Sequence, residues 1–203
     1  MSDAIAHLVD DDEAIRDALG WLLRSRGLQC RAWDSAESFM RDYSPDMRGC
    51  LVLDIRMQAM TGLELFDRLR KRPCLMPVIF LTGHGDIPQA VQALKNGAFD
   101  FVEKPFNDNE LADRVIEAMA LDAQKRAAMT QALEVQDRLA SLTSREKEVM
   151  GCILAGKMNK VIADELNIAM RTVEVHRAHI FEKMGVKSAV ELSSLLADYT
   201  APT

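Results

Sequence analysis

Short apolar runs alternate with amphipathic stretches over residues 1–121, and this alternation limits the possible folds more than any other feature of the chain. It is typical of βαβ units that build a parallel sheet. The central runs at 50–54 and 77–81 are apolar on both faces, which indicates strands covered by helices on both sides. We predict strands near 5–9, 28–33, 50–54, 77–81 and 99–103, and helices near 13–26, 35–43, 63–71, 87–96 and 108–121.

Polar residues stand at the ends of four of these runs. Asp10 and Asp11 follow the first run, and Asp54 ends the third. Thr82 follows the fourth run and Lys104 the fifth. Because the carboxyl ends of parallel strands meet at one edge of the sheet, we expect these side chains to share a crevice. Their chemistry predicts a cation bound beside an aspartate that can itself be phosphorylated.

The crevice offers ligands for a metal ion and partners for a phosphoryl group. The expected ligands of Mg²⁺ (or Mn²⁺) are Asp10, Asp11, Asp54 and the backbone carbonyl of Arg56. Lys104 supplies a compact positive charge for a phosphoryl oxygen, and Thr82 can donate a hydroxyl hydrogen bond to another. The acidic run 10–13 also suits the amino terminus of a helix, so we expect it to serve both purposes.

The composition argues against several classes of protein. No apolar stretch approaches the roughly 20 residues of a membrane span, so we expect no membrane association. Residues 1–121 carry 20 acidic and 14 basic side chains, and hence the whole net charge of −6, which argues against non-specific coating of nucleic acid. The 4 cysteines lack metal-ligand spacing, which favours free thiols in a reducing cytoplasm.

A long helix is predicted after the α/β domain, because no proline or glycine occurs between Asn107 and Leu142. Leu121, Lys125, Ala128, Ala132, Val135, Leu139 and Leu142 repeat there at the spacing of a coiled coil, which is weakened by the lysine and the alanines. A single solvated helix that separates two domains is the alternative interpretation. We expect a domain at 1–121, a helical linker at 122–140 and a second domain at 141–203.

The pattern after Leu142 indicates helices alone. We predict helices from 143 or 144 to about 155, and near 159–166, 170–184 and 188–198. Two short helices at a tight turn, the second polar and facing solvent, are typical of a helix-turn-helix. Val173, Ile180 and Met184 share one face of the third helix, where we expect them in the core. The second domain is thus predicted to be an all-α, four-helix domain.

Four stretches resemble the receiver domain of two-component response regulators: LVDDDE, LVLDIRM, FLTGHGD and FVEKPF. The resemblance covers residues 4–121 and implies a flavodoxin-like fold with strand order 2-1-3-4-5, phosphorylated by a sensor histidine kinase. The family's phosphoacceptor, acidic pair, switch hydroxyl and lysine fall on Asp54, on Asp10 and Asp11, on Thr82 and on Lys104. The bond between Lys104 and Pro105 is usually cis in this family.

Two positions of this chain differ from the residues that are common or functional in the receiver family. Proline is common four residues after the family's phosphoacceptor, whereas this chain has Gln58, and we expect a more mobile loop there. The family's switch aromatic falls on Phe101, which has no hydroxyl, so that its rotation would depend on packing alone. A core phenylalanine is the alternative. The expected dimer surface of the phosphorylated form lies around helix 87–96, with Val91 and Lys95 near its centre.

The stretch from Ser141 to Ser188 resembles the output domain of the NarL and LuxR class of regulators. This resemblance implies a four-helix module whose third helix enters the major groove of DNA. Glu174 and Val175 are the candidates for base contacts, because Glu can accept from cytosine and Val can touch a thymine methyl. The candidates for phosphate contacts are Lys160, Arg171, Thr172, His176, Arg177 and Lys183.

The order of the two domains is similar to that of FixJ-type regulators. We therefore expect a transcriptional activator that dimerises when Asp54 is phosphorylated. Its expected partners are a sensor histidine kinase, double-stranded promoter DNA, RNA polymerase and a second copy of the chain. The alternatives are a phosphohydrolase that uses Asp54, an RNA-binding antiterminator and a receiver that signals without phosphate. Arg56 stands where a phosphohydrolase would need a general acid, so we expect no enzymatic turnover of an external substrate.

Overall fold

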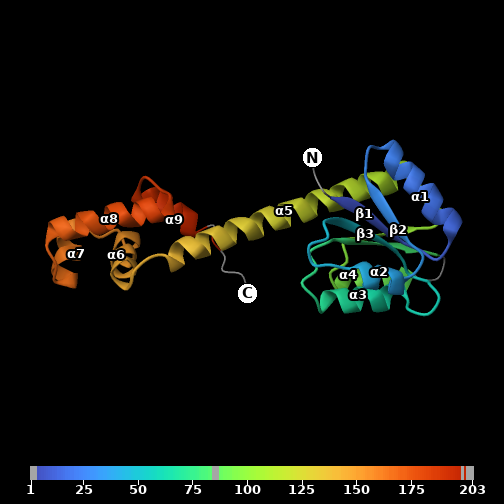
Figure 1. Ribbon diagram of the computed structural model, residues 1–203, viewed down its shortest axis with the longest axis horizontal. Coiled ribbons are helices and arrows are strands. Elements are labelled where there is room, and N and C mark those ends of the chain that lie inside the picture. Colours follow the sequence, from blue (N-terminus) through green and yellow to red (C-terminus); the bar gives the residue numbers. More distant parts are fainter. Residues whose placement is uncertain (1–3, 84–86, 198, 200–203) are drawn as a thin grey trace. The chain divides into compact units, whose positions relative to one another are not determined.

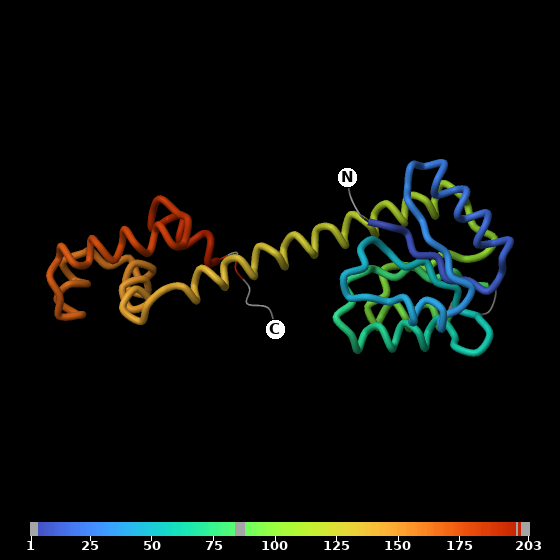
Figure 2. Tube along the Cα trace, in the orientation of Figure 1, coloured from blue at the N-terminus to red at the C-terminus, as the bar shows by residue number. Residues whose placement is uncertain are grey.

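The computed structural model describes residues 4–83, 87–197 and 199, and the chain divides into two compact units, residues 1–126 and 127–203 (Figure 2). The strands of the first unit are β1 Ile5–Val9, β2 Cys30–Trp33, β3 Gly49–Asp54, β4 Val78–Thr82 and β5 Asp100–Glu103. Its helices are α1 Glu13–Ser25, α2 Ala36–Asp42, α3 Gly62–Arg70, α4 Ile87–Lys95 and the first part of α5 Asp108–Ala140. Over the described ranges, no helix combines the length and the apolar character needed to cross a membrane.

The strands form one parallel sheet in the order β2-β1-β3-β4-β5. This order confirms the predicted flavodoxin-like fold. β3 lies at the centre of the sheet, and all of its residues are buried because it pairs on both sides and is covered on both faces. In the register, Asp54 lies beside Leu81 and Thr82 beside Glu103. The carboxyl ends of these strands therefore meet at one edge.

Helices cover both faces of the sheet (Figure 1). α1 and α5 pack on one face, where Leu19 and Val115 enter the core. α2, α3 and α4 pack on the other face through Phe39, Leu65 and Ala90. A fully buried leucine or phenylalanine is more stable than an exposed one by about 1.5–3 kcal/mol, so these two cores hold the layers together.

The second strand is shorter than predicted. We expected it over 28–33, but it begins at Cys30. The chain after α1 is still engaged with the end of that helix, because the Leu28 N–H donates to the Leu23 carbonyl at 3.0 Å. Gly27, with φ 75°, takes the left-handed conformation that ends the helix.

α5 is one unbroken helix over Asp108–Ala140, which confirms the predicted long helix. Of the proposed coiled-coil positions, Val135 and Leu142 are buried, and Leu139 packs against the core of the second unit. Lys125 and Ala128 are exposed. The last apolar positions are thus used within the chain, while Met129 and Leu133 are 48% and 45% exposed. Pairing of this helix with a second chain stays a prediction.

The first compact unit extends past the predicted boundary at residue 121. It ends at Arg126. Asp122 is 1% exposed, and its side chain accepts the Gly49 N–H at 2.8 Å, while Arg126 in turn bonds to Asp122. These bonds attach α5 to the first unit beyond the expected end of the receiver domain.

The second unit contains α6 Ser144–Leu154, α7 Asn159–Leu166, α8 Met170–Met184 and α9 Ala189–Ala197, together with the end of α5. α6 begins with a capping box, in which the side chains of Thr143 and Glu146 accept each other's backbone N–H. Asn167 is left-handed at the turn between α7 and α8. The predicted core residues of α8 are all fully buried: Val173, Ile180 and Met184.

Candidate functional site

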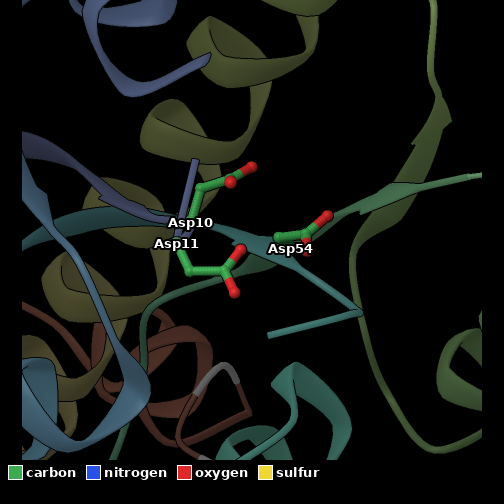
Figure 3. Close-up of side chains that lie close together, drawn as sticks. All are labelled: Asp10, Asp11 and Asp54. Carbon is green, nitrogen blue, oxygen red and sulfur yellow. The ribbon is translucent and has the colours of Figure 1, made fainter. Parts of the chain in front are cut away.

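Four of the five polar residues expected at the strand ends line one cavity at the carboxyl edge of the sheet, whereas Thr82, at the end of β4, is fully buried and is not part of the lining. Figure 3 shows the three aspartates of the cavity. Asp10 follows β1, Asp54 ends β3 and Lys104 follows β5. The cavity has a volume of about 300 Å³. Its lining consists of Asp10, Asp11, Asp12, Ile15, Asp54, Arg56, Gly83 and Lys104. The fold thus brings together side chains that are far apart in the sequence.

Three carboxylates lie close together in this cavity. Asp10 and Asp54 are 2% and 6% exposed, whereas Asp11 is exposed at the mouth. One oxygen of each carboxylate lies within 4.8 Å of the others. Mg²⁺ prefers oxygen ligands and is commonly held by one or two carboxylates together with water. This donor set therefore fits a hard divalent cation.

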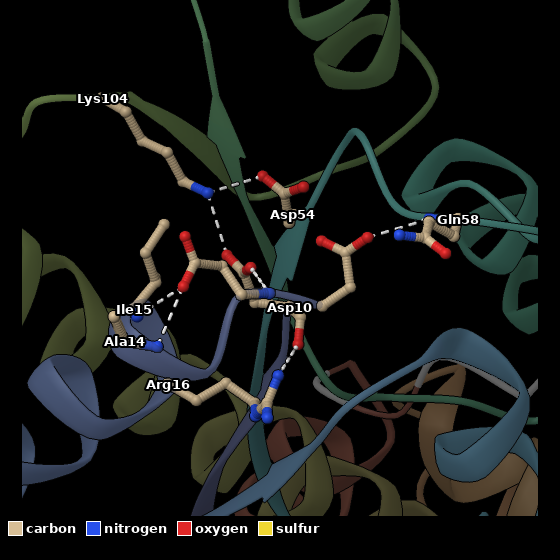
Figure 4. Close-up of polar contacts among 9 residues, drawn as sticks. Asp10, Ala14, Ile15, Arg16, Asp54, Gln58 and Lys104 are labelled. Atoms are coloured by element: carbon tan, nitrogen blue, oxygen red, sulfur yellow. Dashed lines mark hydrogen bonds and ion pairs between the residues drawn. The ribbon is translucent and has the colours of Figure 1, made fainter.

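Lys104 bridges the two buried carboxylates. Its Nζ donates to Asp54 Oδ1 at 2.8 Å and to Asp10 Oδ2 at 2.9 Å (Figure 4). Burial raises the pKa of Asp54, and the bond from Lys104 opposes this only in part. Burial would lower the pKa of Lys104, but its bonds to Asp54 and Asp10 outweigh that effect and raise it. The lysine is therefore held as an ammonium between the carboxylates.

The acidic run after β1 also caps α1. Asp12 accepts the N–H groups of Ala14 and Ile15, at 2.9 Å and 3.4 Å, and so acts as the N-cap residue (Figure 4). Asp10 Oδ1 accepts the Asp12 N–H at 2.9 Å. The capping role expected for this run is therefore present. Hydrogen bonds within the turn also fix the direction of the Asp10 carboxylate.

Gln58 contributes a bond that a proline could not make. Its backbone N–H donates to Asp11 Oδ2 at 3.0 Å (Figure 4). Proline has no backbone N–H, so this contact depends on the departure from the common family pattern. It orients the exposed Asp11 carboxylate beside the buried pair.

Two expected switch residues lie on neighbouring strands. Thr82 is fully buried, and its hydroxyl has no hydrogen-bond partner among the described residues. Buried polar groups are almost always paired, so an acceptor that comes within reach of this hydroxyl would stabilise it. Phe101 is half-buried and packs against the core beside α2, α3 and α4. Its environment here is that of a core phenylalanine. The expected cis bond between Lys104 and Pro105 is present.

The expected dimer surface on α4 is accessible. Val91 is 40% exposed, and Lys95 lies one helical turn later and is also exposed. An exposed valine beside a lysine leaves apolar area and charge available to a partner.

The residues expected at DNA lie on α7 and α8. Their exposed members are Lys160, Arg171, Thr172, Glu174 and Val175, whereas His176 and Arg177 are half-buried. Val175 is 47% exposed, which is a large apolar exposure on a polar helix face. The Arg177 guanidinium lies 5.3 Å from the centre of the Phe181 ring.

Lys183, another expected phosphate contact, forms an ion pair with a carboxylate of its own domain. Its Nζ donates to Glu146 Oε2 at 2.7 Å and to the Ser141 carbonyl at 3.3 Å. Glu146 is 3% exposed, and the bonds from Lys183 and from the Thr143 N–H lower its pKa to about 2. Removing Lys183 from Glu146 would leave a buried charge unpaired. The bond between Lys183 and Glu146 therefore holds α8 against α6.

Two family models match the chain. The response regulator receiver domain matches residues 6–116, and the luxR family of bacterial regulatory proteins matches residues 140–196. The chain is a two-component response regulator with a LuxR-type DNA-binding domain. Both resemblances seen in the sequence are confirmed. The protein is a transcriptional regulator, its receiver domain implies a kinase as partner, and its LuxR-type domain implies binding to DNA.

Relatives match this response regulator over nearly its whole length. The C4-dicarboxylate transport transcriptional regulatory protein DctR of Rhodobacter capsulatus is 50% identical over 93% of this chain and 97% of its own. The transcriptional regulatory protein FixJ of Rhizobium meliloti is 42% identical over 95% of this chain and 94% of its own. The solved structure of the response regulator StyR has a TM-score of 0.90 at 40% identity, and the match covers 98% of this chain and 100% of StyR.

Asp122 and Arg126 were not recognised from the sequence as residues that hold the receiver together. A signal for Asp122 was present, because it continues the four-three-four spacing of the buried positions of α5. Those positions are Leu111, Val115 and Ala118. An aspartate at such a position is polar, so the pattern of apolar residues alone did not mark it.

Proposed function

We propose that this response regulator binds promoter DNA under the control of phosphorylation at Asp54 by a sensor histidine kinase. The observation that carries the proposal is the position of Asp54, buried at the end of the central strand with Lys104 and two further carboxylates beside it. We assign the receiver domain to residues 1–121, the linker to 122–140 and the DNA-binding domain to 141–203. The first turn of this linker is the part that Asp122 and Arg126 bond to the receiver.

The proposed chemistry is the transfer of one phosphoryl group to the protein. A carboxylate oxygen of Asp54 forms a bond to phosphorus while the phosphorus–nitrogen bond of the kinase phosphohistidine breaks, and the imidazole leaves. The ammonium of Lys104 is paired with Asp54 and Asp10, and it would donate a hydrogen bond to a phosphoryl oxygen and offset its negative charge. Later hydrolysis of the acyl phosphate resets the protein, so we expect no turnover of an external substrate.

The proposed cation is Mg²⁺ (or Mn²⁺). Receiver domains generally bind Mg²⁺ through an acidic pocket, and the clustered oxygens of this chain fit that role. Its ligands would be Asp10, Asp11, Asp54 and the backbone carbonyl of Arg56. A bound divalent ion supplies neutralisation of phosphoryl charge. Asp11, oriented by the Gln58 N–H, is the exposed ligand at the mouth.

The proposed switch begins at Thr82. The described residues offer its buried hydroxyl no hydrogen-bond partner, and a phosphoryl oxygen on Asp54 is the acceptor that we assign to it. Movement of Thr82 would leave room for the Phe101 ring to change its position. Because Phe101 has no hydroxyl, only the packing of apolar atoms would drive this change. We propose that the surface around Val91 and Lys95 then pairs with a second phosphorylated chain.

The proposed output is occupancy of a two-fold-related DNA site by the dimer, followed by activation through RNA polymerase. Glu174 and Val175 are assigned to base edges. Lys160, Arg171, Thr172, His176 and Arg177 are assigned to phosphates. Lys183 is assigned to a phosphate as well, because its side chain stays 35% exposed while it is paired with Glu146.

The test is the Asp54→Asn variant. We expect acetyl phosphate to increase the affinity of the wild-type protein for its DNA site by about tenfold or more, and to leave the affinity of Asp54→Asn unchanged. The measurement is fluorescence anisotropy with labelled operator DNA, with and without acetyl phosphate. Asp46→Asn, an exposed aspartate outside the pocket, is the control and should respond like the wild type. A normal response of Asp54→Asn would contradict the proposal.

A further inference from the structure

A group of bonded polar atoms fastens α5 to the receiver sheet; we call it the Asp122 clamp. It consists of the side chains of Asp122 and Arg126 and the backbone of residues 47–49. Gly49 N–H donates to Asp122 Oδ2 at 2.8 Å. Arg126 Nε donates to Asp122 Oδ1 and Oδ2 at 3.0 and 2.9 Å, and Arg126 Nη2 donates to the Met47 carbonyl. The clamp thus joins two segments that are more than 70 residues apart.

The burial of Asp122 shows that the clamp is more than a surface ion pair. Asp122 is 1% exposed and occupies the next position of the buried stripe after Ala118. A charge at such a position is costly unless it is paired and hydrogen-bonded. Arg126 and the Gly49 N–H together satisfy both oxygens of the carboxylate. An apolar residue would cover the sheet equally well, so packing alone does not account for this aspartate.

Gly49 makes the contact specific to the start of β3. It has φ 114°, and a Cβ atom there would lie 2.0 Å from the Ile5 carbonyl oxygen, so a side chain cannot be accommodated. Its buried N–H needs an acceptor, which Asp122 provides. β3 therefore begins at the clamp and ends at Asp54.

The clamp also marks the place where α5 leaves the receiver. The first compact unit ends at Arg126. Most side chains at 127–134 are exposed. A short exposed helical segment gains little stability from its own propensity and depends on tertiary contacts at its ends. The clamp supplies such a contact at the amino-terminal end of the exposed segment.

We propose that Asp122 and Arg126 are positioning residues that couple the receiver to its linker helix. They hold the start of the linker on the same strand that carries Asp54, so that a change at the carboxyl end of β3 is passed to the helix leading to the DNA-binding domain. The inference rests on the proposed function only where DNA affinity is the quantity measured. The attachment of the helix is a separate, directly measurable claim.

The experiment compares Asp122→Ala and Arg126→Gln with the wild-type full-length protein. Glu117→Gln is the matched control, because it removes an exposed ion pair with Arg114 from the same helix. In hydrogen exchange, we expect amides at 119–131 to exchange at least about tenfold faster in both clamp variants, with β3 and β4 unchanged. In anisotropy, we expect both variants to accept phosphate from acetyl phosphate, seen by intact mass, yet to lose the resulting gain in DNA affinity. DNA binding without phosphate should match the wild type.

Two results would overturn the proposal: unchanged exchange at 119–131, or a normal phosphate-dependent gain in DNA affinity in Arg126→Gln. If Asp122→Ala disrupts the receiver, exchange in β3 rises and phosphorylation is lost. Arg126→Gln, which keeps the Asp122 carboxylate for Gly49, then decides the question. If the wild type itself gains no DNA affinity on phosphorylation, the proposed function fails, and the exchange measurement still decides whether the clamp holds the helix.

Discussion

At the scale of a single residue, the proposed switch depends on the Thr82 hydroxyl. Its hydroxyl is fully buried and has no acceptor among the groups that the structure describes. Leaving a buried hydroxyl unpaired costs about 1–3 kcal/mol. In the proposed switch, a phosphoryl oxygen on Asp54 would accept a hydrogen bond from this hydroxyl and remove that cost. The stability of the free protein and its response to phosphate should therefore depend on Thr82 in opposite directions.

Replacing Thr82 with Val tests this opposition. We expect the unphosphorylated Thr82→Val protein to be more stable by about 1 kcal/mol, because the unpaired hydroxyl is replaced by a methyl group of similar shape. We also expect it to lose most of its phosphate-dependent gain in DNA affinity. Urea unfolding measures the first effect and DNA anisotropy the second. Thr82→Ser keeps the hydroxyl and is the control, so it should keep the phosphate-dependent gain in DNA affinity. A full gain in affinity by Thr82→Val would show that the Thr82 hydroxyl has no part in the switch.

Single residues also mark what the sequence could predict about the pocket. Asp10, Asp54 and Lys104 were predicted together, since parallel strands deliver their ends to one edge. The bond from Gln58 to Asp11 was not predicted. A backbone N–H finds its acceptor only when the loop has its final conformation, and residue types do not determine that conformation.

At the scale of elements, α8 is held by a partly buried ion pair. Lys183 on α8 bonds to Glu146 on α6, and the Thr143 N–H bonds to the same carboxylate. These bonds lower the pKa of Glu146 from an ordinary 4.5 to about 2. A lowered carboxyl pKa stabilises the folded state fully above the ordinary value. This stabilisation is lost as the pH falls from 4.5 toward 2.

Glu146→Gln should therefore weaken the second unit at neutral pH and remove this part of its pH dependence. We expect a loss of about 1–3 kcal/mol at neutral pH, because Lys183 and the capping box lose a charged acceptor. The measurement is urea unfolding of the full-length protein at several pH values, followed by NMR signals from α8. Glu148→Gln, which breaks an exposed pair with Arg145, is the control and should change stability little. Equal effects of the two variants would contradict the role of Glu146.

Most elements were predicted from local patterns. The end of α8 at Gly185 and the length of α5 follow from residue types along the chain. The extent of the first compact unit does not. It depends on Asp122 reaching Gly49, a contact across 73 positions that no local pattern encodes.

At the scale of the whole molecule, phosphorylation is proposed to change the number of chains that act together. Val91 on α4 is 40% exposed and lies at the centre of the proposed dimer surface. Burial of such a side chain favours association, and a charge at its position opposes it. Two DNA-binding domains in one dimer would then bind a two-fold-related site with higher affinity than either alone.

The Val91→Asp variant tests this association. We expect the wild-type protein to form dimers after treatment with acetyl phosphate and Val91→Asp to stay monomeric, with phosphorylation of Asp54 unaffected. Sedimentation velocity with and without the donor is the measurement. Leu154→Asp is the control, because Leu154 has a similar exposure of 42% but lies on α6. If phosphorylated Val91→Asp still forms dimers, the dimer interface does not include the surface around Val91.

The sequence by itself determined the two fold classes, the long helix and the group of residues at the carboxyl edge of the sheet. These follow from periodicity and from the common direction of parallel strands, both of which are properties of segments taken one at a time. Only the tertiary structure decided how Lys104 bridges Asp54 and Asp10, and that Lys183 is held by Glu146. Bonds between distant segments arise from the way those segments pack, which local sequence does not specify.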